Sequence, residues 1–278
     1  MRRMDCRQAL IDKIDGNVKQ GQTSAGSVNT AYLSAGEGFP VILLHGAIGG
    51  AVTWYPSIGA MSKCFNVIAP DIVGYGESDK PDASYDRPYF SNWLKDFLLS
   101  LNISKAHIVG LSQGGAIALQ FVLDNPEMVD KLVLVDAAAL GAKPSLASIF
   151  GILWLNSFPS SRANRFYSRC VLYNPDCRDP RHGQYSIEVI KGKGGKKAFR
   201  QGKGAAASTI PDESLRQIQN PTLIVWGEND KLFTIDHGEA AARVIPDSKL
   251  FRIKEAGHLP LMDQPEIFNK AVLEFLAT

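Results

Sequence analysis

The chain has 278 residues, of which 45% are hydrophobic, 21% charged and 9% aromatic. This is the composition of an ordinary globular protein, and it excludes a disordered, collagen-like or coiled-coil chain. Thirty Lys and Arg against 28 Asp and Glu leave a formal net charge of +2, which is too small to favour nucleic acid or an anionic membrane as the main partner. We therefore expect a small-molecule partner.

The N-terminal segment 1–16 lacks the apolar stretch of a secretion signal. The longest apolar run, Ile149 to Leu155, covers about a third of the roughly 20 residues that a membrane-spanning helix needs. Four cysteines are too few and too widely spaced for a disulfide framework or a C-x-x-C metal site, so we expect reduced thiols. The sequence thus predicts a cytoplasmic protein without a membrane span, and it leaves open whether the protein is a monomer or a homodimer.

Short apolar runs rich in β-branched residues follow a polar first 40 residues. Because they are nearly continuous in apolar residues, they predict strands buried on both faces, as in a mostly parallel sheet covered by helices. The clearest helix is the last one, which Asp263 is expected to cap and whose apolar stripe is expected to hold Ile267, Ala271 and Phe275 with Phe268 and Val272. The predicted strands are 41–46, 66–74, 106–112, 131–139, 222–230 and 249–258.

The strand–helix alternation stops between about residues 140 and 210, although this segment carries several large aromatic side chains. A structureless loop of that length is uncommon in a compact domain. We therefore predict an inserted cap (lid) at 140–210, with the α/β core at 1–139 and 211–278. Lysines and arginines crowd residues 191–203, but Lys197 and Ala205 break the phosphate-loop pattern, so this stretch is interpreted as a solvated part of the cap.

The most informative motif is Gly110-Leu111-Ser112-Gln113-Gly114, which follows a predicted strand and precedes an apolar helix. A sharp turn between strand and helix holds a serine in a strained conformation with its hydroxyl exposed, and small neighbours let the two elements approach. The turn also places the serine at a helix N-terminus, where developing negative charge is favoured. Ser112 is the predicted nucleophile.

A serine nucleophile needs a base, which a carboxylate must orient. His258 follows the last predicted strand on a loop with Gly257, and it is the best placed of the five histidines. Asp230 ends the preceding strand, 28 residues earlier, and is the predicted acid; Asp136, at the end of the strand before that, is the alternative. The other histidines, His45, His107, His182 and His237, are interpreted as turn-shaping, packing or solvated residues, and Asp71 as the anchor of a turn.

An acyl-transfer site also needs donors for the oxyanion, each worth roughly 3 kcal/mol. The backbone N–H of Gln113, next to the nucleophile, is one candidate. The Gly-rich loop 45–50 follows the first predicted strand and supplies the other, with Ala47 the best placed.

Five motifs occur in an order that resembles the serine hydrolases of the α/β-hydrolase fold, and the resemblance extends from about residue 28 to 277. They are HGAIGG (45–50), DIVGYGESDKP (71–81), GLSQGG (110–115), WGEND (226–230) and EAGHLP (255–260). The resemblance implies a mostly parallel sheet of about eight strands flanked by helices, an inserted cap, and no metal or organic cofactor. Related epoxide hydrolases and haloalkane dehalogenases carry Asp at the nucleophile position, so Ser112 argues against both.

The members that this sequence is most similar to are carboxylesterases and the meta-cleavage-product hydrolases, which cut a carbon–carbon bond. The latter often carry Gly-Asn-Ser-Met-Gly at the serine, where this chain has Leu111 and Gln113, so we favour ester hydrolysis and keep the carbon–carbon hydrolase as the alternative. A ligand-binding receptor of this fold is a third possibility. An apolar pocket for uncharged substrates is predicted from Ile48, Trp54, Leu111, Trp154, Phe158 and Leu259.

Overall fold

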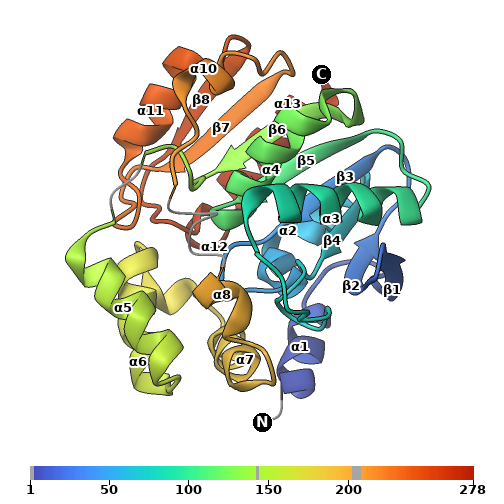
Figure 1. Ribbon diagram of the computed structural model, residues 1–278. Coiled ribbons are helices and arrows are strands. Elements are labelled where there is room, and N and C mark those ends of the chain that lie inside the picture. The colour runs from blue at the N-terminus through green and yellow to red at the C-terminus, as the bar shows by residue number, and fades with distance from the viewer. Residues whose placement is uncertain (1–2, 142–143, 202–207) are drawn as a thin grey trace.

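The computed structural model describes residues 3–141, 144–201 and 208–278. Its core is an eight-stranded sheet with the strand order β1-β2-β4-β3-β5-β6-β7-β8, in which every pair from β4 to β8 is parallel (Figure 1). This architecture confirms the predicted α/β-hydrolase fold. The strands are β1 (Lys19–Ala25), β2 (Val28–Ala35), β3 (Pro40–Leu44), β4 (Asn66–Pro70), β5 (Ala106–Leu111), β6 (Val129–Val135), β7 (Thr222–Gly227) and β8 (Ser248–Ile253).

The first two strands were not among the strands predicted from the apolar runs. β1 and β2 form an antiparallel hairpin that pairs with β4, also antiparallel. β1 is at the edge of the sheet and mostly exposed, so its sequence KQGQTSA has no continuous apolar run. An antiparallel edge strand of this kind faces water, and its sequence does not resemble that of the buried parallel strands.

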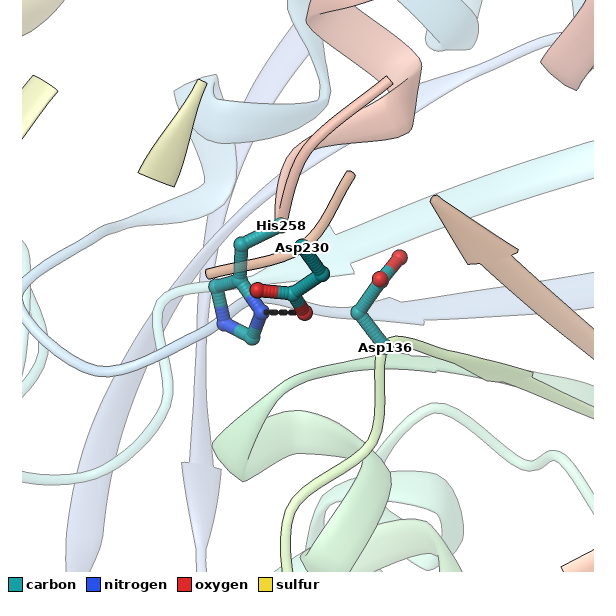
Figure 2. A group of neighbouring side chains, drawn as sticks. All are labelled: Asp136, Asp230 and His258. Carbon is teal, nitrogen blue, oxygen red and sulfur yellow. Dashed lines mark hydrogen bonds and ion pairs between the residues drawn. The ribbon is translucent and has the colours of Figure 1, made fainter. Parts of the chain in front are cut away.

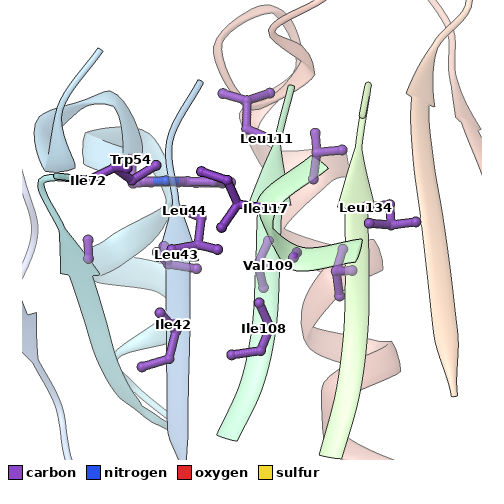
Figure 3. Packing of buried hydrophobic residues seen from close by; sticks show 14 of the residues in the cluster. Ile42, Leu43, Leu44, Trp54, Ile72, Ile108, Val109, Leu111, Ile117 and Leu134 are labelled. Atoms are coloured by element: carbon purple, nitrogen blue, oxygen red, sulfur yellow. The ribbon is translucent and has the colours of Figure 1, made fainter. Parts of the chain in front are cut away.

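The central strands carry the core. Every residue of β5 and β7 is buried, as is most of β3, β4 and β6, which explains their runs of Val, Ile and Leu. Figure 3 shows side chains of β3, β5 and β6 packed beside Ile117, which comes from the helix that follows β5.

Helices cover both faces of the sheet. α3 (Arg87–Ser100) and α4 (Gln113–Asp124) pack together on one face, and α2 (Tyr55–Met61) and α13 (Pro265–Ala277) pack together on the other. α11 (Ile235–Val244) packs against β7 and β8. Short helical turns occupy Ala51–Trp54, Pro126–Met128, Pro175–Cys177, α10 (Asp212–Leu215) and α12 (Pro260–Asp263).

The C-terminal helix corrects two expectations. Gln264, not Asp263, is the N-cap of α13, and it makes no side-chain cap. Asp263 accepts hydrogen bonds from the backbone N–H groups of Gly257, Tyr173 and Asn174. Of the five residues expected in the apolar stripe of α13, Phe268, Ala271 and Val272 are buried, whereas Ile267 is 46% exposed.

Among the described residues between β6 and α10, four α-helices lie beyond the sheet, and we call them the cap helices (Figure 1). They are α5 (Leu146–Ser157), α6 (Ser161–Val171), α7 (Pro180–Lys191) and α8 (Lys197–Gln201). Residues 202–203 of the basic stretch and Ala205 lie outside the described residues. None of the described helices is both long and apolar enough to cross a bilayer, and the four cysteines are free.

The N-terminal helix α1 (Arg3–Ile11) packs against α7 of the cap. Its buried Arg7 pairs with Asp71 of the core at 3.0 Å and donates to the Tyr185 hydroxyl of α7 at 3.3 Å. One guanidinium therefore joins three parts of the chain that are far apart in sequence.

Candidate active site

Ser112 occupies a strained turn between β5 and α4, with φ 53° and ψ −115°. Its backbone N–H donates to the Val135 carbonyl of β6 at 2.9 Å, which fixes the turn against the sheet. The flanking glycines are required by space: a Cβ on Gly114 would lie 2.2 Å from the Leu44 carbonyl oxygen, and one on Gly110 would lie 2.4 Å from that of Gly114. A non-glycine residue at positive φ held by this packing is the geometry expected of a nucleophile.

Two backbone donors lie beside the serine. Gln113 begins α4, and Ala47 belongs to the loop after β3. Neither N–H makes a hydrogen bond to any residue that the structure describes. Gly46 brings that loop close, since a Cβ on it would be 3.2 Å from the Cβ of Ser112. The side-chain oxygen of Gln113 accepts from the Tyr75 hydroxyl at 2.9 Å, which fixes that side chain away from its own backbone N–H.

His258 and Asp230 form a buried pair, with His258 Nδ1 and Asp230 Oδ2 separated by 2.7 Å (Figure 2). The other Asp230 oxygen accepts from the N–H groups of Leu232 and Phe233 at 2.7 and 3.0 Å. Because the carboxylate accepts the Nδ1 proton, the Nε2 atom of the neutral ring is left as the acceptor. The arrangement can supply a general base.

Ser112 and His258 line one cavity. Among the described residues no hydrogen bond joins the serine hydroxyl to the imidazole, and such bonds are often long in a free enzyme and tighten in the substrate complex. Asp136, the alternative acid, makes no hydrogen bond to His258 either, and it lies on the far side of Asp230 (Figure 2).

His45 and Asp71 hold the loops around the site. His45 Nε2 accepts from the backbone N–H of Ile72 at 3.0 Å, so its Nδ1–H donates to the Gly46 carbonyl at 2.7 Å. Burial lowers the pKa of His45, which keeps this tautomer neutral. Asp71 accepts from the N–H groups of Ala51 and Glu77, which confirms its expected role as a turn anchor.

The cavity contains about 820 Å³ of space free of protein atoms, including its opening to solvent. Three of the six predicted lining residues border it: Ile48, Leu111 and Leu259. The other three do not. Trp54 is fully buried against Phe268, Trp154 packs with Phe150 and Phe166, and Phe158 is 73% exposed. The observed apolar lining is completed by Ile152, Tyr167, Phe199, Leu232 and Phe233.

Sequence reasoning missed a polar group in the cap wall of this cavity. Arg178 is buried, and all its hydrogen-bond partners are neutral: His182 Nδ1 at 2.8 Å, Asn164 at 3.2 Å, Ser168 at 2.9 Å and Ser186 at 3.3 Å. A guanidinium has five N–H donors, so one donor has no partner among the described residues. No carboxylate among the described residues forms an ion pair with Arg178, so a charged group interrupts the apolar lining expected from the sequence.

His182 fixes the position of this arginine. Because its Nδ1 accepts from Arg178, its Nε2–H donates to the Thr53 hydroxyl at 3.2 Å. Burial and the adjacent Arg178 charge lower the pKa of His182 well below its usual range, so the ring stays neutral. The interpretation of His182 as an ordinary packing or solvated histidine left out this role. No motif marks either residue, since each depends on contacts between α6, α7 and the core.

The site combines a strained serine, two backbone N–H groups without partners among the described residues, and a buried His–Asp pair. Together with the fold, this arrangement is typical of a hydrolase. Residues 40–265 match the family model described as the alpha/beta hydrolase fold, so the chain belongs to that family.

Relatives of two kinds resemble the chain. Carboxylesterase YbfK of Bacillus subtilis is 28% identical over 240 residues, which cover 85% of this chain and 79% of the relative. A 2-hydroxy-6-oxo-6-(2'-aminophenyl)hexa-2,4-dienoic acid hydrolase of Metapseudomonas resinovorans is 30% identical over 281 residues, covering 97% and 95%.

Solved structures of both kinds share the fold. The crystal structure of the Bacillus subtilis carboxylesterase CesB (YbfK) has a TM-score of 0.90 at 25% identity and covers 99% of this chain and 96% of that chain. The meta-cleavage product hydrolase CumD of Pseudomonas fluorescens IP01 has a TM-score of 0.82 at 29% identity, covering 93% and 98%. The chain is thus a hydrolase similar to carboxylesterases and to carbon–carbon bond hydrolases.

Proposed function

We propose that the protein is a serine hydrolase of small to medium carboxylic esters, with Ser112 as nucleophile, His258 as base and Asp230 as the acid that orients the base. The observation that carries this proposal is the strained Ser112 in one cavity with His258, whose Nδ1 is held by Asp230 at 2.7 Å. The cap helices cover this cavity as an inserted lid, through Ile152, Tyr167 and Phe199.

The reaction runs in two steps. His258 Nε2 takes the Ser112 proton as the oxygen attacks the ester carbonyl, and the N–H groups of Ala47 and Gln113 stabilise the oxyanion. The imidazolium returns its proton to the departing alcohol and leaves an acyl-enzyme. Water then attacks that ester and gives its proton to His258, which passes it to the departing Ser112 oxygen as the acid is released.

Arg178 extends the proposal to the charge of the substrate. A buried cation without a carboxylate partner is costly, and a charged ligand group would supply that partner. We therefore replace the expectation of uncharged substrates with one of mainly apolar substrates that carry one anionic group, which Arg178 binds.

The same arginine favours a second candidate, the hydrolysis of a carbon–carbon bond in a ring-fission product. The relatives named for such reactions act on hexadienoates, which carry a carboxylate by definition. That carboxylate would meet Arg178 while Ser112 and His258 act on the distant ketone.

A rate panel tests both candidates. It compares ethyl hexanoate with monoethyl adipate, which have acyl chains of equal length and differ by one carboxylate, and adds a 2-hydroxy-6-oxo-dienoate. The S112A variant is the blank. We expect monoethyl adipate to be cleaved faster than ethyl hexanoate, and S112A to cleave neither. A dienoate turned over much faster than either ester would establish the second candidate, and equal rates in S112A and the unaltered protein would refute both.

A further inference from the structure

Asp136 is a buried carboxyl that the proposed mechanism does not use. It follows β6 with φ 42°, a backbone conformation that non-glycine residues rarely adopt. Its backbone N–H donates to the Val225 carbonyl at 3.0 Å, and its Oδ1 accepts from the N–H of Gly227 at 3.1 Å. Its other oxygen, Oδ2, is buried and has no hydrogen-bond partner among the described residues. A buried polar atom without a partner needs an explanation.

Asp230 has one acceptor site to spare. An ionised carboxylate offers about four lone-pair sites. The N–H groups of Leu232 and Phe233 occupy two of them, and His258 Nδ1–H occupies a third. One polar atom each of Asp136, Asp230 and His258 lies within 4.8 Å of the others, and Asp136 is beside Asp230 on the side away from His258 (Figure 2).

Two adjacent buried carboxylates cannot both be ionised at low cost, because like charges repel strongly where water is absent. Burial, the charge of Asp230 and, less strongly, that of Asp263 raise the pKa of Asp136 well above its usual range. Asp230 accepts three N–H hydrogen bonds, whereas the side chain of Asp136 accepts one, from Gly227. The proton of the pair therefore belongs on Asp136.

We propose that Asp136 is a positioning residue, a neutral carboxylic acid whose O–H donates to Asp230 and holds that carboxylate in the orientation that His258 needs. The inference rests on the proposed function. The proton stays between the two carboxyls throughout the reaction, and the pair carries one negative charge.

The D136N variant decides between a neutral and an ionised Asp136. Asn has the same shape and keeps a donor, so replacing a neutral acid leaves the charge near His258 unchanged. We then expect the acidic limb of the pH–rate profile of kcat/KM, where His258 takes up its proton, to stay in place. If Asp136 were ionised, the variant would remove a negative charge, and the limb would move to lower pH.

The D136A variant removes the donor. The Asp230 charge is then less dispersed and stabilises the imidazolium more, so we expect the acidic limb to move to higher pH. We also expect kcat to fall about tenfold, because Asp230 is no longer held in place. D136N is expected to avoid most of both effects. A loss of thermal stability without movement of the limb would indicate a merely structural role and overturn the proposal.

Infrared difference spectra provide the direct readout. The unaltered protein minus D136N is expected to show the C=O band of a protonated carboxylic acid at neutral pH, and absence of that band would overturn the proposal. Loss of activity on chelation, with recovery on adding zinc, would instead make the Asp136, Asp230 and His258 cluster a metal site. Labelling of Ser112 by a serine-directed organophosphonate is measured in parallel: if it fails, the proposed function fails with it, whereas labelling without the infrared band removes only this inference.

An independent observation concerns the outer surface of the cap. Helix α5 exposes Leu146, Phe150 and Leu153, at 86%, 55% and 53%, on one face, and Phe158 follows at 73%. Monomeric soluble proteins rarely expose contiguous apolar patches of this kind without a partner.

Three arginines lie on the neighbouring helix α6. Phe166 of α6 contacts Phe150, with ring centroids 5.5 Å apart. The exposed Arg162, Arg165 and Arg169 lie within about one turn of Phe166 on α6, and none of them forms an ion pair with a described residue. The overall charge of +2 hides this asymmetry: residues 146–201 contain ten Lys and Arg against three Asp and Glu, whereas the rest of the chain has an excess of acids.

We propose that this α5–α6 surface docks on an anionic lipid bilayer. Exposed apolar side chains on α5 and exposed arginines on the adjacent helix α6 match the boundary between acyl chains and anionic headgroups. A second copy of the chain is a poorer occupant, because a two-fold interface would bring two sets of unpaired arginines together.

Co-sedimentation with vesicles tests the proposal. We expect the protein to sediment with phosphatidylcholine vesicles that contain phosphatidylglycerol, much less with phosphatidylcholine alone, and less at high salt. F150S/L153S should abolish binding, and each of R162Q and R165Q should weaken it about fivefold. The matched controls I267S and K270Q, on exposed positions of α13, should bind normally, and all these variants should keep their activity on a soluble ester.

Two results would overturn this proposal. One is recovery of the unaltered protein in the supernatant with both kinds of vesicle, or unchanged binding by F150S/L153S. The other is a concentration-dependent dimer in sedimentation equilibrium that F150S/L153S abolishes, which would make the surface an interface between copies.

Discussion

The two walls of the catalytic cavity are built differently. The core wall places Ser112 and the Ala47 and Gln113 amides through backbone geometry, with glycines where a side chain would clash. The cap wall places Arg178 through side-chain contacts with His182 and its neutral neighbours. We therefore expect the reaction type to depend on the residues at the edge of the sheet and the choice of substrate to depend on the cap helices.

The largest loss of activity is expected from a substitution in the core wall of the cavity. Replacing His258 with Gln removes the base, and we expect kcat to fall by roughly 10⁴- to 10⁶-fold on every substrate, because the residues of such a site act as a unit. H237Q, which changes a histidine outside the cavity, is the matched control and should keep full activity. A kcat of H258Q within tenfold of that of the unaltered protein would contradict the role of His258 as the base.

The next largest effect, on stability, is expected from the contact that joins the core to the cap helices. Arg7 pairs with the buried Asp71 and contacts Tyr185 of the cap. R7M leaves a buried carboxylate without its partner, so we expect the free energy of unfolding to fall by about 3 kcal/mol in denaturant titrations. K270M breaks an exposed ion pair with Glu274 and should change it by less than about 1 kcal/mol. Equal effects of the two variants would mean that Arg7 does not join the walls.

The cap wall should affect substrates selectively. R178M removes the charge, and we expect kcat/KM for monoethyl adipate to fall roughly 10- to 100-fold, as for the loss of a hydrogen bond to a charged group, while that for ethyl hexanoate changes little. R169M, on the exposed side of α6, is the control. If R178M slowed both substrates equally, Arg178 would support the cap and not bind the substrate.

The sequence was most informative where the backbone carries the geometry. Gly110, Ser112 and Gly114 are readable because only small residues fit that turn, and the buried parallel strands are readable because they are apolar on both faces. The sequence was least informative where side chains from distant elements meet. Arg178 and its partners come from α6, α7 and the loop before α7, and no local pattern brings them together.

The aromatic residues of the cap helices also could not be placed from the sequence. An apolar helix such as α5 has no polar face to reveal which side is buried, so Trp154 and Phe158 were assigned to the pocket although neither borders it. The exposed β1 edge was missed because its polar sequence lacks the pattern of a buried strand.

The smallest expected effect is a change in KM that distinguishes two apolar residues, both of which the sequence predicted to line the pocket. Ile48 borders the cavity, whereas Phe158 is exposed away from it. We expect I48A to raise KM for ethyl hexanoate about fivefold, because roughly 1 kcal/mol of apolar contact with the substrate is lost, and F158A to leave it unchanged. A larger change in F158A than in I48A would mean that the outer surface of the cap takes part in substrate binding.

The most direct test of the account is covalent labelling of the nucleophile. The protein is treated with an organophosphonate that reacts only with activated serines, and the site is located by peptide mass analysis. We expect one adduct per chain, on Ser112, with none in S112A or H258Q. Labelling of another serine, or normal ester turnover by S112A, would contradict the account.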